Sequence, residues 1–266
     1  MDIGASVGPY LDRIDTLPAS FSFVEPALGE GERPLAEVDT AALSDRLDSC
    51  GLNAVVHLPY RQPLSTPVES VDEATLDYLD GVLATAADVG ATAVVAHPRT
   101  RGSGRDNLRD RARRLRERAD RRGLTLCFET TGHAGGPPLD RVGAVADDAG
   151  AAVCLDVGYA YLEAGTDGVA AFLDTYEDVV DHLHVHGARR RGDTHIPVGS
   201  GDVDFDALGP RLADADPATA TVAVFTDDPG YLRASATRFY AVLPAPARDP
   251  APPPPLTRSR IQRVQV

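Results

Sequence analysis

The sequence predicts an α/β fold, a single closed (β/α)8 barrel, from three observations. Eight short β-rich runs alternate with helical patterns along the chain. Glycines close several of these helices just before the next strand, as αβ joints require, at Gly51, Gly90, Gly123 and Gly150. The length of 266 residues matches one such barrel. Eight units in series favour a closed parallel barrel, and an open doubly wound sheet is the alternative.

Strands are expected where β-branched and apolar residues cluster, at 3–7, 21–25, 54–58, 93–97, 125–129, 152–156, 180–186 and 221–225. Helices fit between them at about 8–18, 38–50, 73–89, 106–122, 139–149, 167–178, 204–215 and 229–242. The clearest helix is 106–122, because apolar residues recur there at helical spacing and Gly123 closes it. The alternation stops after Leu243. The barrel is therefore expected to span 1–243, and residues 244–266, with four consecutive prolines at 252–255, to form a disordered proline-rich tail.

The composition predicts a cytoplasmic protein adapted to high salt. The net charge is -14, lysine is absent, and aspartate outnumbers glutamate by about three to one. Such a surface holds hydration water and limits aggregation. The first residues lack the basic and apolar regions of a secretory signal, and no apolar run of about twenty residues is present, so neither secretion nor membrane association is expected. The absence of lysine excludes Schiff-base chemistry, and no glycine-rich loop of the P-loop or dinucleotide type is present.

Polar side chains mark the ends of five predicted strands. They are His57, His97, Glu129, Asp156 and His184. The carboxyl ends of the strands meet at one rim of a barrel, and period-2 alternation directs each of these side chains inward. Imidazole and carboxylate together suit divalent metal ions, with zinc favoured over manganese or magnesium. The sequence therefore predicts a metal site at this rim.

The remaining candidate residues receive plainer interpretations. Cys127 and Cys154 are expected to fill the barrel interior, and His182 to be packed and hydrogen-bonded. His133 is expected in a substrate loop or at the surface. The run Arg189-Arg190-Arg191 either grips a phosphate or forms a solvated loop.

Several motifs resemble the xylose isomerase-like barrel superfamily, which includes the endonuclease IV family of AP endonucleases (AP endonuclease family 2) and many sugar and sugar-phosphate isomerases and epimerases. The matching segments are His57-Leu58-Pro59-Tyr60, His97-Pro98, Cys127-Phe128-Glu129, Leu155-Asp156-Val157-Gly158, His184-Val185-His186, Asp193-Thr194-His195 and the run 199–205. The resemblance extends to about Leu243. The last of these, Gly-Ser-Gly-Asp-Val-Asp-Phe, is the most specific.

The resemblance implies three metal positions. His57, His97 and Glu129 would hold one ion, Glu129 would bridge to a second held with Asp156 and His184, and Asp193 with His195 would hold a third. Tyr60 would lie beside the first position and contact the substrate. Two positions depart from the endonuclease pattern: Tyr159 replaces a histidine, and the last strand lacks its usual glutamate, for which Asp227 is the candidate substitute.

These departures favour phosphodiester hydrolysis by a metal-bound hydroxide, with Glu129 in the catalytic centre. Epimerases of the superfamily are expected to use two glutamates on opposite faces of the sugar, and the second is missing from the last strand. A sugar or sugar-phosphate isomerase or epimerase is the alternative, and a non-catalytic metal- or sugar-binding barrel is the third. A small phosphorylated or nucleotide-like substrate is favoured over DNA, because the surface is acidic. The sequence leaves the oligomeric state open.

Overall fold

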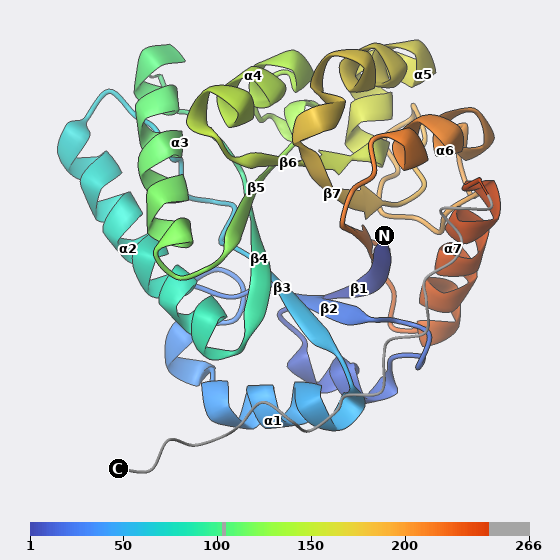
Figure 1. Ribbon diagram of the computed structural model, residues 1–266, viewed down its shortest axis with the longest axis horizontal. Helices are drawn as coiled ribbons and strands as arrows, with labels where there is room; N and C mark the ends of the chain where they lie inside the picture. Colours follow the sequence, from blue (N-terminus) through green and yellow to red (C-terminus); the bar gives the residue numbers. More distant parts are fainter. Residues whose placement is uncertain (103–104, 245–266) are drawn as a thin grey trace.

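A computed structural model describes residues 1–102 and 105–244, and it shows a closed barrel of eight parallel strands arranged in sequence order (Figure 1). Parallel pairing of the last strand with the first closes the ring, beginning at Asp2 opposite Thr219. The predicted (β/α)8 barrel is therefore confirmed. The strands are β1 (Asp2–Gly8), β2 (Phe23–Pro26), β3 (Asn53–His57), β4 (Ala91–Ala96), β5 (Thr125–Glu129), β6 (Ala152–Asp156), β7 (Val180–Val185) and β8 (Thr219–Val222).

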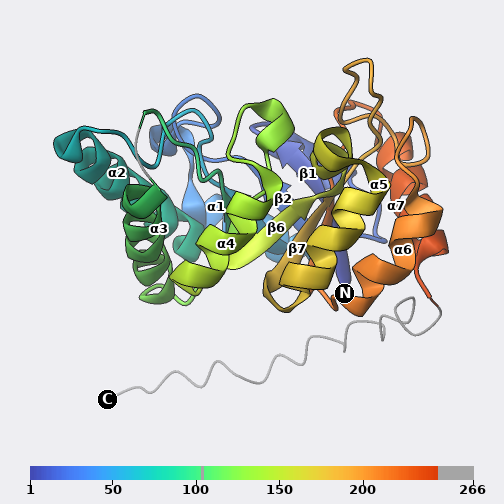
Figure 2. The ribbon, with the colours of Figure 1, turned by 90° about the horizontal axis from the view of Figure 1, so that it is seen from above.

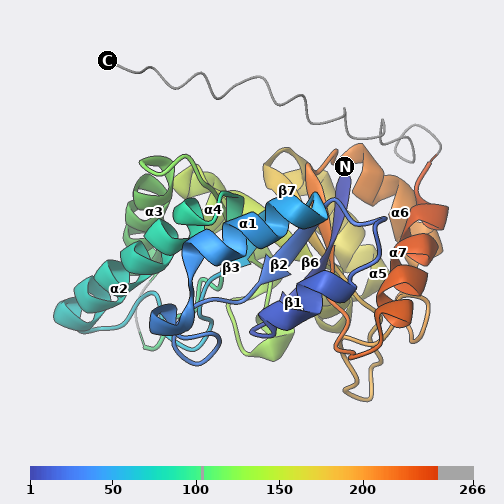
Figure 3. The same ribbon diagram turned by 90° about the horizontal axis from the view of Figure 1, so that it is seen from below.

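Helices surround the ring of strands, as the views in Figures 2 and 3 show from two opposite sides. They are η1 (Leu11–Thr16), α1 (Thr40–Cys50), α2 (Glu69–Asp88), α3 (Arg105–Asp120), α4 (Leu139–Ala149), α5 (Val157–Tyr176), α6 (Phe205–Asp214) and α7 (Pro229–Val242). No helix in the described part of the chain is both long and apolar enough to cross a membrane.

Most helices lie where the sequence predicts them, with two differences. The segment expected as a helix at about 8–18 forms only the short 3-10 helix η1. Helix α5 begins at Val157, about ten residues before the predicted start, because the Asp156 carboxylate accepts a hydrogen bond from the Tyr159 backbone N–H at 2.7 Å and caps it. Helix α5 is kinked at Gly165, whose φ of 72° is not helical. Asp156 therefore ends a strand and starts a helix.

The apolar residues that recur at helical spacing in the sequence are buried against the barrel. In α3, the four apolar residues at helical spacing are all fully buried: Leu108, Ala112, Leu115 and Ala119. Gly51 and Gly150 end α1 and α4 with φ of 68° and 66°, the left-handed conformation that glycine adopts without strain. The predicted glycine caps at these two joints are therefore confirmed.

The inward-facing side chains of the strands fill the lower part of the barrel with a small apolar plug. Cys127 and Cys154 belong to it and are fully buried, as predicted. On each of β2 to β6, one plug residue precedes by two positions the polar residue at or just after the end of the strand, so it lies one pleat deeper. The polar strand ends therefore stand on an apolar floor. The plug consists of Phe23, Val55, Ala93, Val95, Cys127 and Cys154.

The close approach of β1 to the Phe23 ring gives a stability prediction. A Cβ atom on Gly4 would lie 2.4 Å from that ring, so Gly4→Ala is expected to overpack the plug and lower the free energy of unfolding by about 1–3 kcal/mol. In guanidinium denaturation the midpoint should fall with an unchanged slope. Gly81→Ala on α2, where an added Cβ meets no atom within 4 Å, is the control and should not destabilise. An unchanged midpoint for Gly4→Ala would show that Phe23 is loosely packed.

The C-terminal end of the barrel differs from the prediction in register. Strand β8 is Thr219–Val222 rather than 221–225, so Phe225 and Asp227 lie in the loop that follows it. Pairing with β1 and β7 determines which four residues of this apolar run form the strand. The proline-rich tail predicted from residue 244 lies outside the described residues from 245 onward.

Candidate functional site

A cavity of about 770 Å³ opens at the carboxyl ends of the barrel strands. His57, His97, Glu129 and His184 line it, and the buried Asp156 lies within 4.0 Å of His184. These five side chains come from β3, β5, β6, β7 and the residue that follows β4. The predicted convergence of the five on one rim is confirmed by these contacts. Their role as metal ligands stays a prediction.

Glu129 lies at the centre of this group. Its Oε2 is 2.5 Å from His97 Nε2 and 3.1 Å from His57 Nε2, and its Oε1 is 3.0 Å from His184 Nδ1. Burial raises the pKa of Glu129, but the charges and hydrogen bonds of these histidines outweigh burial and hold the pKa well below its usual value. Glu129 is therefore an ionised carboxylate that faces three imidazoles.

Glu25 is a site residue that the sequence analysis missed. It ends the inward face of β2, is 2% exposed, and its Oε1 lies 3.0 Å from His184 Nε2. Thr221 Oγ1 on β8 donates to Glu25 Oε2 at 2.6 Å, and His182 Nε2 lies 3.1 Å from the same oxygen. The signal was present, because a glutamate closes the predicted strand 21–25 just as Glu129 closes 125–129.

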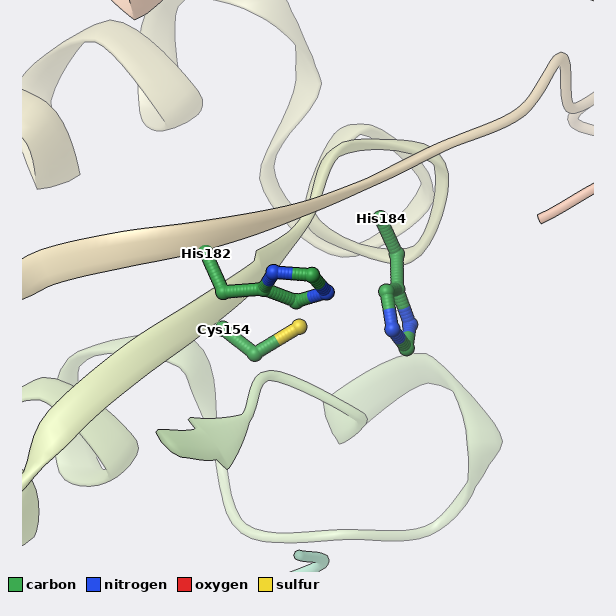
Figure 4. Close-up of side chains that lie close together, drawn as sticks. All are labelled: Cys154, His182 and His184. Carbon is green, nitrogen blue, oxygen red and sulfur yellow. The ribbon is translucent and has the colours of Figure 1, made fainter. Parts of the chain in front are cut away.

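His184 is held between the two glutamates, with one ring nitrogen facing each carboxylate at 3.0 Å. Burial lowers the pKa of His184, but Cys154, Glu25 and Glu129 raise it well above its usual value. Beneath it, His182 contacts Thr219 Oγ1 at 2.6 Å and is fully buried, as predicted for a packed, hydrogen-bonded histidine. Figure 4 shows the Cys154 thiol directed between the rings of His182 and His184.

The prediction that Asp227 would replace the missing glutamate of the last strand is wrong. Its side chain is 92% exposed and pairs with Arg13 at the cavity mouth. The inward-facing residue of β8 is Thr221, which is fully buried and bonded to Glu25. The second glutamate of the floor therefore comes from β2, on the other side of the barrel closure, rather than from β8.

The third metal position was predicted at Asp193 and His195, but among the described residues His195 is grouped with Asp156 and His186 instead. Asp193 Oδ2 accepts hydrogen bonds from Arg189 at 2.8 Å and Arg191 at 3.0 Å within its own loop, and these two bonds lower its pKa. His195 instead stacks on His186, with ring centroids 4.1 Å apart. The arginine run thus supplies internal ion pairs for its loop and does not line the cavity.

Asp156 completes a third group with these two histidines. His186 Nε2 lies 3.0 Å from Asp156 Oδ1, and both residues are fully buried. Burial lowers the pKa of His195 to about 3, so this imidazole is neutral at physiological pH and carries a lone pair on one ring nitrogen. His186, which the sequence analysis did not select, therefore takes the place expected for Asp193.

Tyr60, which was predicted to contact the substrate, and Tyr159, which stands in place of the family histidine, both line the cavity. The Tyr60 ring lies 5.6 Å from the ring of His97, and Tyr159 lies edge-on to His186 and His195 at 5.5 and 5.4 Å. Burial, then the charges of the nearby carboxylates, raise the pKa of Tyr159 to about 12, so its hydroxyl stays protonated. His133, in the loop that follows β5, lies 6.1 Å from Tyr159.

Among the described residues, three of the four possible donor sets adjoin the cavity, and within each set the ligand atoms lie within 4.8 Å of one another. Neutral imidazole nitrogen and carboxylate oxygen are ligands that zinc and manganese accept, and shared carboxylates can bridge two ions. The chemistry of the donors therefore fits divalent cations. The sets are His57, His97 and Glu129; Glu129, Asp156 and His184; and Asp156, His186 and His195.

The orientation of His57 gives a separate test of this fit. Its Nδ1 lies 2.8 Å from the Leu58 backbone oxygen, and because a carbonyl only accepts, Nδ1 carries a proton. In the neutral ring, Nε2 then presents a lone pair to Glu129 Oε2 at 3.1 Å. Such atoms repel unless Nε2 is protonated or a cation lies between them. Two ligands that each lie about 2.0–2.2 Å from one zinc ion are about 3 Å apart, so this pair fits a shared ion.

Comparisons with solved structures find the same fold in several other proteins. The chain is similar to an L-ribulose 3-epimerase (18% identity, TM-score 0.70, covering 88% of this chain and 86% of that chain). It is also similar to D-psicose 3-epimerase from Clostridium cellulolyticum H10, solved with D-tagatose (15% identity, TM-score 0.72, covering 92% of this chain and 100% of that chain). A third similar structure is the IOLI protein with a bound zinc atom (13% identity, TM-score 0.74, covering 91% of this chain and 98% of that chain). No curated protein sequence matches the chain.

These identities are low, so the solved structures establish a common fold. The family model of the xylose isomerase-like TIM barrel matches residues 19–242, which is most of the chain and includes every candidate residue described above. The match agrees with the motifs at the strand ends and with the closed eight-stranded barrel. The chain therefore belongs to the xylose isomerase-like TIM barrel family of enzymes.

Proposed function

We propose that the protein is a divalent-metal-dependent sugar isomerase or epimerase. The observation that carries this proposal is the pair of buried glutamates at the cavity floor, Glu25 on β2 and Glu129 on β5. The sequence favours hydrolysis because the last predicted strand lacks a glutamate. Glu25 removes this reason for hydrolysis, because it provides a second carboxylate at the cavity floor from β2. The similarity to 3-epimerase structures supports the same alternative.

The two glutamates are placed for proton transfer from different sides. Each lies 3.0 Å from a different nitrogen of His184, so the imidazole separates them. Isomerisation and epimerisation move a proton at a carbon next to a carbonyl, and they need a base to remove it and an acid to return it. Glu129 and Glu25 both contact histidines that can share a proton with them. We assign the two carboxylates to these steps.

The same floor supplies the ligands for a metal ion. Glu129, Asp156 and His184 would hold it, and His57 and His97 would hold a second or support the first. A bound divalent ion would act as a Lewis acid that polarises the sugar carbonyl and fixes its neighbouring hydroxyl. Zinc is our first choice and manganese the second, since both accept nitrogen and carboxylate ligands. Tyr60 and Tyr159 would contact the substrate from the cavity walls.

Hydrogen exchange tests this function directly. In D2O, the metal-loaded protein is expected to introduce deuterium next to the carbonyl of a ketose, and proton NMR over a panel of ketoses and ketose phosphates would detect it. Exchange reports proton removal even when the equilibrium between sugars is unfavourable. If no ketose in the panel exchanges above the rate without protein, the proposal is wrong.

Phosphodiester hydrolysis is the second candidate, because the three donor sets share Glu129 and Asp156 as two-metal sites do. We expect no incision of an abasic-site DNA duplex above background across a salt series. The acidic surface disfavours DNA, and no observation at the cavity requires a nucleotide. Tyr60→Ala is the informative variant, because an extruded nucleotide would stack on this ring. Efficient incision by the wild type that collapses in Tyr60→Ala would make the protein a DNA repair enzyme.

A further inference from the structure

The cavity carries opposite charges on its floor and its walls. Glu25 and Glu129 make the floor acidic, whereas three arginines line the walls: Arg13, Arg61 and Arg99. In a chain of net charge -14, a group of cations at one cavity is unexpected. Many other arginines pair with acids on a neighbouring helix: Arg118 of α3 pairs with Asp77 of α2, and Arg122, just beyond α3, pairs with Asp80 of α2.

The three cavity arginines differ in whether an acid already neutralises them. Arg13 pairs with Asp227 and lies over the Tyr10 ring at 4.1 Å. Within the described residues, neither Arg61 nor Arg99 has an ion pair within 4.0 Å. Glu32 lines the same cavity and is influenced by the charge of Arg61, but it too lies beyond that distance. Arg61 and Arg99 therefore have charge available for a ligand.

The backbone holds these two arginines in neighbouring loops. The Leu64 N–H donates to the Arg99 backbone oxygen at 2.8 Å and so ties the loop after β3 to the loop after β4. Arg99 also donates from one terminal nitrogen to the Ala134 backbone oxygen at 3.1 Å, which orients the guanidinium; within the described part of the chain its other donors make no ion pair or side-chain hydrogen bond. Arg61 lies over the Tyr60 ring at 5.5 Å, and Tyr60 contacts His97 at the floor.

We propose that Arg61 and Arg99 bind the phosphate group of a phosphorylated sugar whose carbonyl end lies on the acidic, metal-binding floor. This inference rests on the proposed function for the sugar end of the ligand. Guanidinium groups bind phosphate oxygens through paired, charge-assisted hydrogen bonds, which a neutral sugar cannot replace. A ketose phosphate satisfies both parts of the cavity, because its hydroxyls and carbonyl suit the floor and its dianion suits the arginines.

Calorimetric titration with two ligands that differ only in the phosphate tests the site. D-ribulose 5-phosphate is expected to bind the metal-loaded wild type about 100-fold more tightly than D-ribulose, at constant ionic strength. Arg61→Gln and Arg99→Gln should each weaken the phosphate ester about tenfold, and the double variant should bind both ligands equally. Arg113→Gln on the exposed face of α3 makes the same charge change away from the cavity and should bind as the wild type does.

The outcomes separate this site from the proposed function. Equal binding of the two ligands by the wild type, no binding of either, or tight binding of the ester by the double variant each overturns the phosphate site. Deuterium exchange into a neutral ketose would then leave the isomerase assignment standing. Arginine-dependent binding of the ester without exchange in any ketose would instead retain the phosphate site and reject the isomerase.

Discussion

Glu129→Gln is expected to lose the bound metal and at least about 100-fold of the exchange activity while the barrel stays folded. The carboxylate belongs to two of the three donor sets and contacts three histidines. An amide has nearly the same volume but carries no charge and is a poor bridging ligand. Elemental analysis of the purified protein, deuterium exchange and thermal unfolding would measure the three quantities separately.

The control for this variant is Glu117→Gln, which makes the same chemical change on the exposed face of α3. It should keep the metal, the activity and the unfolding temperature of the wild type. The assignment of Glu129 is wrong if its glutamine variant retains wild-type metal content and turnover. If Glu129→Gln instead fails to fold, the carboxylate is required for the hydrogen bonds with the histidines, and the milder Glu129→Asp should fold with reduced metal affinity.

Glu25→Gln is expected to lower the exchange activity by at least about 100-fold while the metal content stays near that of the wild type. Glu25 lies at the floor but belongs to none of the three donor sets. Its amide replacement can still accept the hydrogen bond that Thr221 donates at 2.6 Å, so the local packing is retained. What is lost is the ability to accept or return a proton.

Thr221→Val is the companion variant, because it removes the hydroxyl that orients Glu25 and leaves the carboxylate in place. A smaller loss of activity than in Glu25→Gln is expected, with unchanged metal content. Metal loss in Glu25→Gln comparable to that in Glu129→Gln would identify Glu25 as a ligand rather than a proton-transfer group. Wild-type exchange in Glu25→Gln would leave the proposed reaction without its second carboxylate.

Local periodicity determined much of the site. His57, Glu129, Asp156 and His184 share the inward face of their strands because side chains alternate every residue along a strand, whatever its partners are. The repeated strand-helix alternation then brings strand ends that are far apart in sequence to one rim, because all strands of a closed barrel run in the same direction. The same reasoning identifies Glu25, whose position at the end of a predicted strand was not used.

Tertiary structure decided the features that depend on a partner. Strand β8 ends at Val222 because β1 and β7 pair with only four residues of a longer apolar run, and this places Asp227 at the exposed mouth. Asp193 bonds its own loop arginines rather than His195, since a loop side chain takes the nearest opposite charge in three dimensions. Sequence thus determined which residues face the cavity from regular strands, where the repeat is local. The folded chain alone decided the loop contacts, because the conformation of an irregular loop follows no repeat that the sequence shows.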